Sequence, residues 1–372
     1  MAGRTFFTFL ILLFTLGGCM KPTSYRPAVS DERVAGEQEK QRRIALQRSA
    51  KLKQRLAEVS YPLRRAAADF CPEEQRAGTG IYFTHPYAYQ DGFRDTARAL
   101  FKLPDGVKVS HVVSGTPAAR AGVLPGDRLL VIGGHTIQSG EAGIKALRRY
   151  YRKEVKAGEP LVIRIRRDGR EMSMEVETER VCGYPVVLKE SGRINAFSDG
   201  RRVLVTPGMI RFAENDHELG MVIAHELAHN AMHHMDARRI NSMGGMVLDV
   251  LAASAGVFTK GYFSKLTGRA FSQEFEAEAD YVGLYILARA GVPIEESANF
   301  WRRMAAERPS DIRGIKGATH PTTAKRFLLI EETVSEIRQK RLKGLAMEPE
   351  MKARRQKGLA LMSGAQGSSG KG

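Results

Sequence analysis

The pentapeptide His225-Glu226-Leu227-Ala228-His229 decides how the C-terminal half of this chain folds. On an α-helix, two histidines four residues apart project from one face, about 6 Å apart along the axis. Both imidazoles can therefore bind one Zn²⁺, and Glu226 lies beside them, where it can accept a proton without being a ligand. Asn215 and Glu218 have the spacing of a capping box, which predicts that the helix begins there.

A metal site of this kind needs a third ligand, and the sequence offers two candidates. His233 continues the histidine stripe, but it would lie about 12 Å from His225 along the axis, too far for one tetrahedral ion. We therefore expect His233 and His234 on a polar helix face; the alternative is that they support the ligand histidines. Glu276 is followed four residues later by Asp280, so one carboxylate can bind metal while the other orients a ligand histidine. Taken alone, this segment fits an acidic helix face equally well.

Further motifs flank this helix in a defined order. Asn195-Ala196-Phe197 precedes it, and Glu276-x-x-Ala279-Asp280, His320-Pro321 and Arg326 follow it. Together with the pentapeptide, these motifs resemble those of the M48 family of gluzincin metallopeptidases. The resemblance covers about residues 184–338 and implies a zinc endopeptidase.

The resemblance also implies a role for each motif residue. One Zn²⁺ per chain would be held by His225, His229 and Glu276. Asp280 would orient a ligand histidine, and Glu226 would be the catalytic base. His320, with Arg326, would stabilise the oxyanion; the alternative is that His320 plugs the metal's open position. The strand at Asn195, Ala196 and Phe197 would pair with an extended substrate.

Residues 77–181 have the alternation of β-strands, with an Asp168-Gly169 hairpin turn. Within them, Ser114–Leu130 resembles the core signature of bacterial PDZ domains, which bind extended peptides at a sheet edge. Phe101–Gly106, where we looked for the carboxylate-binding glycine loop, lacks its pattern. We expect a PDZ-like module, inserted within the peptidase, that binds peptides or regulates the protease.

The first eighteen residues have the order of a secretory signal, with Arg4, an apolar run from Phe6 to Leu16 and two glycines. Leu16–Cys19 resembles the lipobox of bacterial lipoproteins, which implies lipidation of Cys19. A signal cleaved without lipidation, or an uncleaved anchor, is the alternative. Met20, in place of an aspartate, favours the outer membrane. The protein is thus expected in the cell envelope, lipid-anchored and facing the periplasm.

The formal net charge of the 372-residue chain is +17, which would ordinarily suggest a nucleic-acid partner. Export argues against that partner and favours anionic lipid, glycolipid or cell-wall polymer; the alternative is that the charge serves solubility alone. If Cys19 is lipidated, Cys71 and Cys182 are the remaining thiols of an oxidising compartment, and they bracket the PDZ-like stretch. We expect them to form a disulfide; two separately buried thiols are the alternative.

The predicted fold class is α+β, with a mostly helical zincin-type domain that has a small β-hairpin or sheet, and a β-rich PDZ-like domain. Pro62 is expected to end or restart an N-terminal helix, and Met246–Phe258 to form a buried or lid helix, with membrane dipping as the alternative. The predicted segments are a signal peptide (1–18), a linker (19–30), N-terminal helices (31–76), the PDZ-like domain (77–181), the M48-like domain (182–339) and a disordered basic tail (340–372).

These features predict a zinc metalloendopeptidase that degrades misfolded or unassembled envelope proteins, with polypeptides as substrates and the membrane reached through the lipid anchor. The alternative is a proteolytically silent PDZ-containing lipoprotein that binds client proteins.

Overall fold

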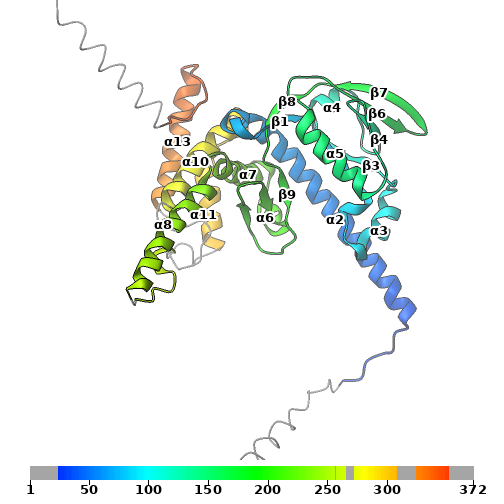
Figure 1. Cartoon of the computed structure of the whole chain (residues 1–372), viewed down its shortest axis with the longest axis horizontal. Helices are drawn as coiled ribbons and strands as arrows, with labels where there is room; N and C mark the ends of the chain where they lie inside the picture. Colours follow the sequence, from blue (N-terminus) through cyan, green and yellow to red (C-terminus); the bar gives the residue numbers. More distant parts are fainter. Residues whose placement is uncertain (1–23, 256, 265–271, 308–323, 352–372) are drawn as a thin grey trace, which may run out of the picture. The chain divides into compact units, whose positions relative to one another are not determined.

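The computed structural model describes residues 24–255, 257–264, 272–307 and 324–351 (Figure 1). The chain divides into two compact units, Met1–Ile44 and Ala45–Gly372. In the first unit, the described structure is an extended segment and the exposed beginning of a helix. The second unit contains both the PDZ-like domain and the helical domain with the metal-binding motifs, so the predicted α+β class is confirmed.

The helix α2 (Asp31–Ala66) runs without interruption through Pro62, so the expected break there is wrong. Leu56, Tyr61 and Leu63 are all buried around this position. Their packing outweighs the roughly 3 kcal/mol that proline costs inside a helix. Leu56 and Leu63 also belong to the same hydrophobic core as the helix of the pentapeptide, so residues before the PDZ-like stretch pack with those after it.

The PDZ-like domain is an antiparallel sheet in the order β2-β3-β4-β6-β7, with β5 paired to β4. Its strands are β2 (Ile81–Thr84), β3 (Val107–Val112), β4 (Arg128–Ile132), β5 (His135–Thr136), β6 (Leu161–Arg167) and β7 (Arg170–Val176). Its helices are α3 (Asp91–Phe101), α4 (Pro117–Arg120) and α5 (Gly140–Glu154). The turn between β6 and β7 uses Asp168 at φ 48° and Gly169 at φ 81°, as the dipeptide predicts.

The two ends of the PDZ-like stretch meet in a separate ribbon. β1 (Gln75–Gly78) pairs antiparallel with β8 (Glu179–Cys182). A disulfide joins Cys71 to Cys182, with their Cα atoms 5.4 Å apart, which is the pairing we expected. Tyr61 of α2 also donates a 2.8 Å hydrogen bond to Glu179. The ends of the inserted domain are therefore held together beside α2.

The helical domain begins with a three-stranded sheet in the order β10-β11-β9. Its elements are β9 (Val186–Leu188), β10 (Ala196–Ser198), β11 (Val203–Val205), α6 (Pro207–Phe212), α7 (Asp216–Ala231), α8 (His234–Ser254), α10 (Ser272–Arg289), α11 (Ser297–Glu307) and α13 (Ala324–Leu342). Helix α10 packs closely along α7. Gly283 permits this approach, since a Cβ there would lie 3.2 Å from the Cα of His225.

Two expectations about the C-terminal half of the chain differ from the structure. Residues 340–351 were expected to start a disordered tail, but α13 continues to Leu342 and Lys340 donates to the carbonyl of Glu348 and to the carboxylate of Glu350. The rest of that tail lies outside the described residues. Met246–Phe258 was expected to be a buried or lid helix; burial is wrong, because most of its large side chains are exposed in the described chain, and the lid role is untested.

Candidate active site

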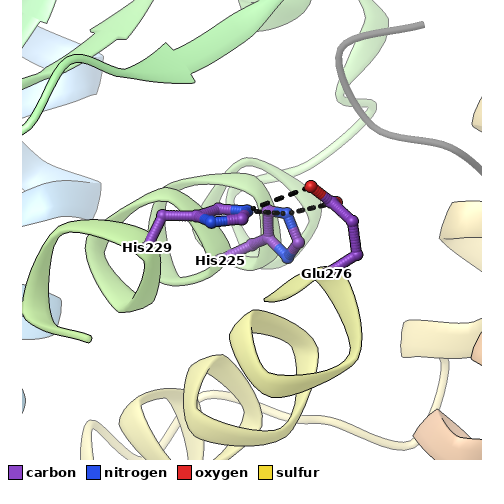
Figure 2. A group of neighbouring side chains, drawn as sticks. All are labelled: His225, His229 and Glu276. Atoms are coloured by element: carbon purple, nitrogen blue, oxygen red, sulfur yellow. Dashed lines mark hydrogen bonds and ion pairs between the residues drawn. The ribbon is translucent and has the colours of Figure 1, made fainter. Parts of the chain in front are cut away.

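The three expected metal ligands converge from two neighbouring helices (Figure 2). His225 and His229 project from α7, and Glu276 projects from the first turns of α10. All three side chains are buried, and their ligand atoms lie within 4.8 Å of one another. The cap that positions α7 is also the predicted one, since Asn215 Oδ1 accepts from the backbone N–H of Glu218 at 3.0 Å.

The separations between these ligand atoms fit one tetrahedral zinc ion. The Nε2 atoms of His225 and His229 are 3.1 Å apart, and they lie 3.3 and 3.4 Å from the two carboxylate oxygens of Glu276. Ligands at about 2.0–2.1 Å from a tetrahedral ion are separated by about 3.3 Å. The donor set of two imidazoles and one carboxylate also leaves one position open, as in catalytic rather than structural zinc sites.

Asp280 and Arg326 support the first histidine. Asp280 Oδ1 accepts from His225 Nδ1 at 2.9 Å, which leaves Nε2 to face the metal. Burial alone would raise the pKa of Asp280, but the charge of Arg326 and the hydrogen bond from His225 lower it below its ordinary value. The carboxylate therefore stays ionised and fixes the tautomer of the imidazole.

Arg326 was expected to help stabilise the oxyanion, and the structure gives it another set of contacts. Its Nε and Nη2 donate to the two oxygens of Asp280 at 2.7 and 2.9 Å, and its Nη1 lies 3.4 Å from Glu276. The guanidinium is buried, 5.5 Å from the ring centre of Trp301. This geometry makes Arg326 a positioning residue for both carboxylates. His320, its expected companion, lies outside the described residues.

Sequence reasoning favoured a polar helix face for His234 and so missed its contact with the second histidine, which it held only as the alternative. His234 Nδ1 lies 2.9 Å from His229 Nδ1, and His234 Nε2 lies 2.8 Å from the carboxylate of Glu278. Helix α7 ends at Ala231. His233, at φ 54°, changes the direction of the chain there, and the His234 side chain contacts His229. His234 is 2% exposed, which contradicts the polar helix face expected for it. Only a sequence signal for the end of α7 at Ala231 could have predicted this contact.

Glu226 is buried on α7 next to the first ligand, at 2% exposure. Its position in the pentapeptide places it beside the histidines rather than among the three converging ligand atoms. A carboxylate beside the open position of such a site can accept a proton from a reacting water molecule.

The expected substrate strand is an edge strand next to the catalytic helix. Ala196 and Phe197 lie in β10, which pairs with β11 on one side and forms the end of the three-stranded sheet in the described chain. Asn195 precedes this strand, and its backbone is held by Thr206. Asn230, a second residue that sequence reasoning missed, accepts from the backbone N–H of Gly200 at 3.0 Å and so ties the hairpin to α7.

The PDZ-like domain has a groove of about 500 Å³ between β2 and α5. Apolar and basic side chains line it together, including Ile81, Phe83, Ile144, Leu147, Arg148 and Arg152. A glycine-containing stretch, Gly78-Thr79-Gly80, lines the groove between the end of β1 and the start of β2, whereas the stretch 101–106 in which we looked for one does not. His85 also faces this groove, and its buried Nδ1 has no hydrogen-bond partner among the described residues.

This centre, with two histidines and a glutamate on adjoining helices, has the donor set of catalytic zinc sites in metallopeptidases. Comparison with known families agrees. The model of Peptidase family M48 matches residues 164–334, and the model of the PDZ domain matches residues 80–178. The chain thus contains a Peptidase family M48 domain and a PDZ domain.

Similar proteins include metalloendopeptidases. Mitochondrial metalloendopeptidase OMA1 of Schizosaccharomyces pombe is 32% identical over 154 residues, which cover 40% of this chain and 45% of that protein. Beta-barrel assembly-enhancing protease of Escherichia coli is 25% identical over 177 residues, covering 41% of this chain and 34% of that protein. The chain thus spans less than half the length of these relatives.

Solved structures resemble the chain over a smaller part. The HtrA-type protease AlgW with decapeptide is 23% identical, with a TM-score of 0.22, over 28% of this chain and 30% of that one. The HtrA3 PDZ domain bound to a phage-derived ligand is 18% identical, with a TM-score of 0.21, over 29% of this chain and 88% of that one.

Proposed function

We propose that this protein is a zinc-dependent endopeptidase of the cell envelope that degrades misfolded or unassembled envelope proteins. The observation that carries the proposal is the convergence of His225, His229 and Glu276 at separations that fit one zinc ion. The M48 domain and the metalloendopeptidase names of its relatives support the same class of reaction.

The chain's own residues would divide the work of peptide hydrolysis. His225, His229 and Glu276 would hold the zinc ion, which would supply Lewis-acid polarisation of the attacking water and of the scissile carbonyl. Glu226 takes a proton from that water as its oxygen bonds to the carbonyl carbon, and it returns the proton to the leaving amine nitrogen when the C–N bond breaks. His320 is proposed as the donor that stabilises the oxyanion. Asp280 and His234 keep the ligand imidazoles in the tautomers that the metal requires.

The edge strand β10 supports a polypeptide substrate in extended form. A segment added to this edge would be recognised through its main-chain hydrogen bonds, and such recognition reads backbone more than side-chain sequence. The enzyme would then select substrates because they are unfolded, rather than because of a particular amino-acid sequence. The PDZ groove would capture a second segment of the same substrate, or would regulate the protease when occupied.

The envelope location rests on the sequence of the N-terminus. Cys19, the proposed lipid attachment site, and the signal peptide before it lie outside the described residues. The disulfide between Cys71 and Cys182 fits an oxidising compartment. None of the described helices is long and apolar enough to cross a membrane.

Cleavage of a denatured protein separates this proposal from the alternative of a silent client-binding lipoprotein. The full chain should cleave unfolded casein, lose that activity to a chelator, and regain it when zinc is added back. A preparation that contains one zinc per chain but cleaves no denatured protein, while its PDZ domain still retains clients, would favour the silent lipoprotein.

A further inference from the structure

An exposed apolar hairpin begins in the helix that comes next after the catalytic helix α7. We define this apolar hairpin as the described residues of 240–264, which comprise the second part of α8 and the segment after it (Figure 1). Ten of the twenty large hydrophobic side chains that are exposed in the described chain lie within it. They are Ile240, Met243, Met246, Val247, Leu248, Val250, Leu251, Val257, Phe258 and Tyr262.

These side chains are spread widely around the helix. With about 100° per residue, the exposed positions from Met243 to Leu251 cover about 200° of the circumference of α8. A helix that docks on one protein surface needs an apolar stripe about half as wide. Val257 and Phe258 extend the apolar surface beyond the end of the helix. An apolar medium that surrounds the hairpin fits this distribution better than a groove on a partner.

One of the two charged side chains of the hairpin has its hydrogen-bond partners within the hairpin. Its charged residues are only Asp249 and Lys260. Asp249 accepts hydrogen bonds from the hydroxyl of Thr259 and from the backbone N–H groups of Phe263 and Ser264. The carboxylate thus joins the two arms of the hairpin and has internal donors in place of water.

The dimensions and charges of the hairpin favour one leaflet of an anionic membrane. From Met243 to Ser254 the helix is about 18 Å long, close to half of the roughly 30 Å hydrocarbon core. Arg238 and Arg239 precede the apolar part. Arg201 is exposed on the β10–β11 turn, where Gly200 approaches Met235 near the start of α8. These arginines would lie at the level of acidic headgroups if the apolar part were inserted.

We propose that the apolar hairpin inserts into one leaflet of an anionic lipid membrane, as a contact separate from the lipid anchor. The hairpin begins in the helix that starts at His234, about two helical turns before the apolar part, so its insertion would hold the metal site near the membrane surface. The inference does not depend on peptidase activity, since it rests on exposure, charge and length alone.

A probe at Val250 tests the insertion locally. In the full chain with Cys19→Ser, which removes the lipid attachment, Val250→Cys supplies the one free thiol because Cys71 and Cys182 are bridged. A label of the NBD type on that thiol should shift its emission to the blue and brighten several-fold with vesicles of phosphatidylethanolamine and phosphatidylglycerol. Nitroxide on the acyl chains should quench it. Val162→Cys, at a similarly exposed valine of β6, is the matched control and should not respond.

Three results would overturn the proposal. They are no response at position 250, an equal response at position 162, or a blue shift without vesicles that grows with protein concentration, which would indicate a second copy as the partner. In vesicle flotation of the Cys19→Ser chain, Leu248→Glu with Leu251→Glu should lower the bound fraction several-fold, whereas Leu124→Glu with Leu328→Glu should not. All four leucines are exposed, and unchanged zinc content and circular dichroism would show that each variant is folded.

Discussion

Arg326 holds Asp280 by two parallel hydrogen bonds, from Nε to Oδ2 at 2.7 Å and from Nη2 to Oδ1 at 2.9 Å. Both side chains are buried. Asp280 in turn orients His225, and a third nitrogen of Arg326 lies 3.4 Å from Glu276. One guanidinium on α13 therefore positions two of the three metal ligands.

Replacing Arg326 with Lys should weaken zinc binding, because an ammonium group cannot reproduce the paired geometry. We expect zinc affinity to fall by about 10- to 100-fold. Loss of the paired hydrogen bonds to the buried Asp280 carboxylate should also lower the free energy of unfolding by about 1.5–3 kcal/mol. Zinc titration and chemical denaturation measure the two effects. Arg302→Lys, in the half-exposed pair with Glu331, is the control and should change both by little. Unaltered zinc affinity in Arg326→Lys would remove Arg326 from the support of the site.

His234 provides the second test of ligand support. If His229 binds zinc through Nε2, its Nδ1–H donates to His234, whose Nε2–H donates to Glu278. His234→Ala should therefore lower zinc affinity by about 10- to 100-fold, and excess zinc should restore activity. His217→Ala is the control, because this histidine is exposed in the first turn of α7 and belongs to the same helix as the ligand histidines. Equal zinc affinities in the two variants would contradict the role of His234.

The contrast between these two supporting groups shows what the sequence could predict. Helical spacing within uninterrupted helices relates the residues of the pentapeptide to one another, and likewise Glu276 to Asp280. The helical periodicity and the family resemblance were therefore enough to locate these residues. His234 depends on where α7 ends and on a left-handed residue at 233. Histidine adopts that conformation more often than most residues do, but too rarely for the residue type alone to predict it.

The same limit applies to larger elements. The Asp168-Gly169 turn and the Asn215 cap are local signals, and both are present as predicted. The continuity of α2 through Pro62 depends on tertiary packing. Helix α8 is exposed because no described part of the chain packs over its apolar side chains. Neither could be deduced from hydrophobicity, because an apolar helix has the same sequence pattern whether protein or lipid covers it.

Glu226→Gln should separate metal binding from catalysis. The side chain is not among the converging ligand atoms, so the zinc content should stay near one per chain. Loss of the general base should lower kcat by about 10²- to 10⁴-fold. Metal analysis and casein cleavage on the same preparation measure the two quantities. Glu274→Gln, at an exposed position of α10, is the control and should leave both unchanged. Substantial turnover by Glu226→Gln would refute the proposed role of this residue.

The last prediction concerns the PDZ groove and its histidine. Burial, with the nearby charge of Arg148, lowers the pKa of His85 to about 4 from its ordinary value of 6.5. Arg148 donates to Nε2 at 3.1 Å, so the neutral ring is the form that the folded domain stabilises. Between pH 6.5 and 4 the unfolded chain binds a proton at this histidine and the folded chain does not.

Stability should therefore be complete above pH 6.5 and decrease as the pH falls towards 4, by up to about 3 kcal/mol from this group. Urea denaturation of the full chain at pH 7, 5.5 and 4.5, monitored in the PDZ domain, measures this dependence. His85→Gln keeps an acceptor for Arg148 but does not titrate, so its loss of stability over the same interval should be smaller by most of that amount. Identical pH dependence in the two proteins would mean that His85 is protonated as readily in the folded domain as in the unfolded chain.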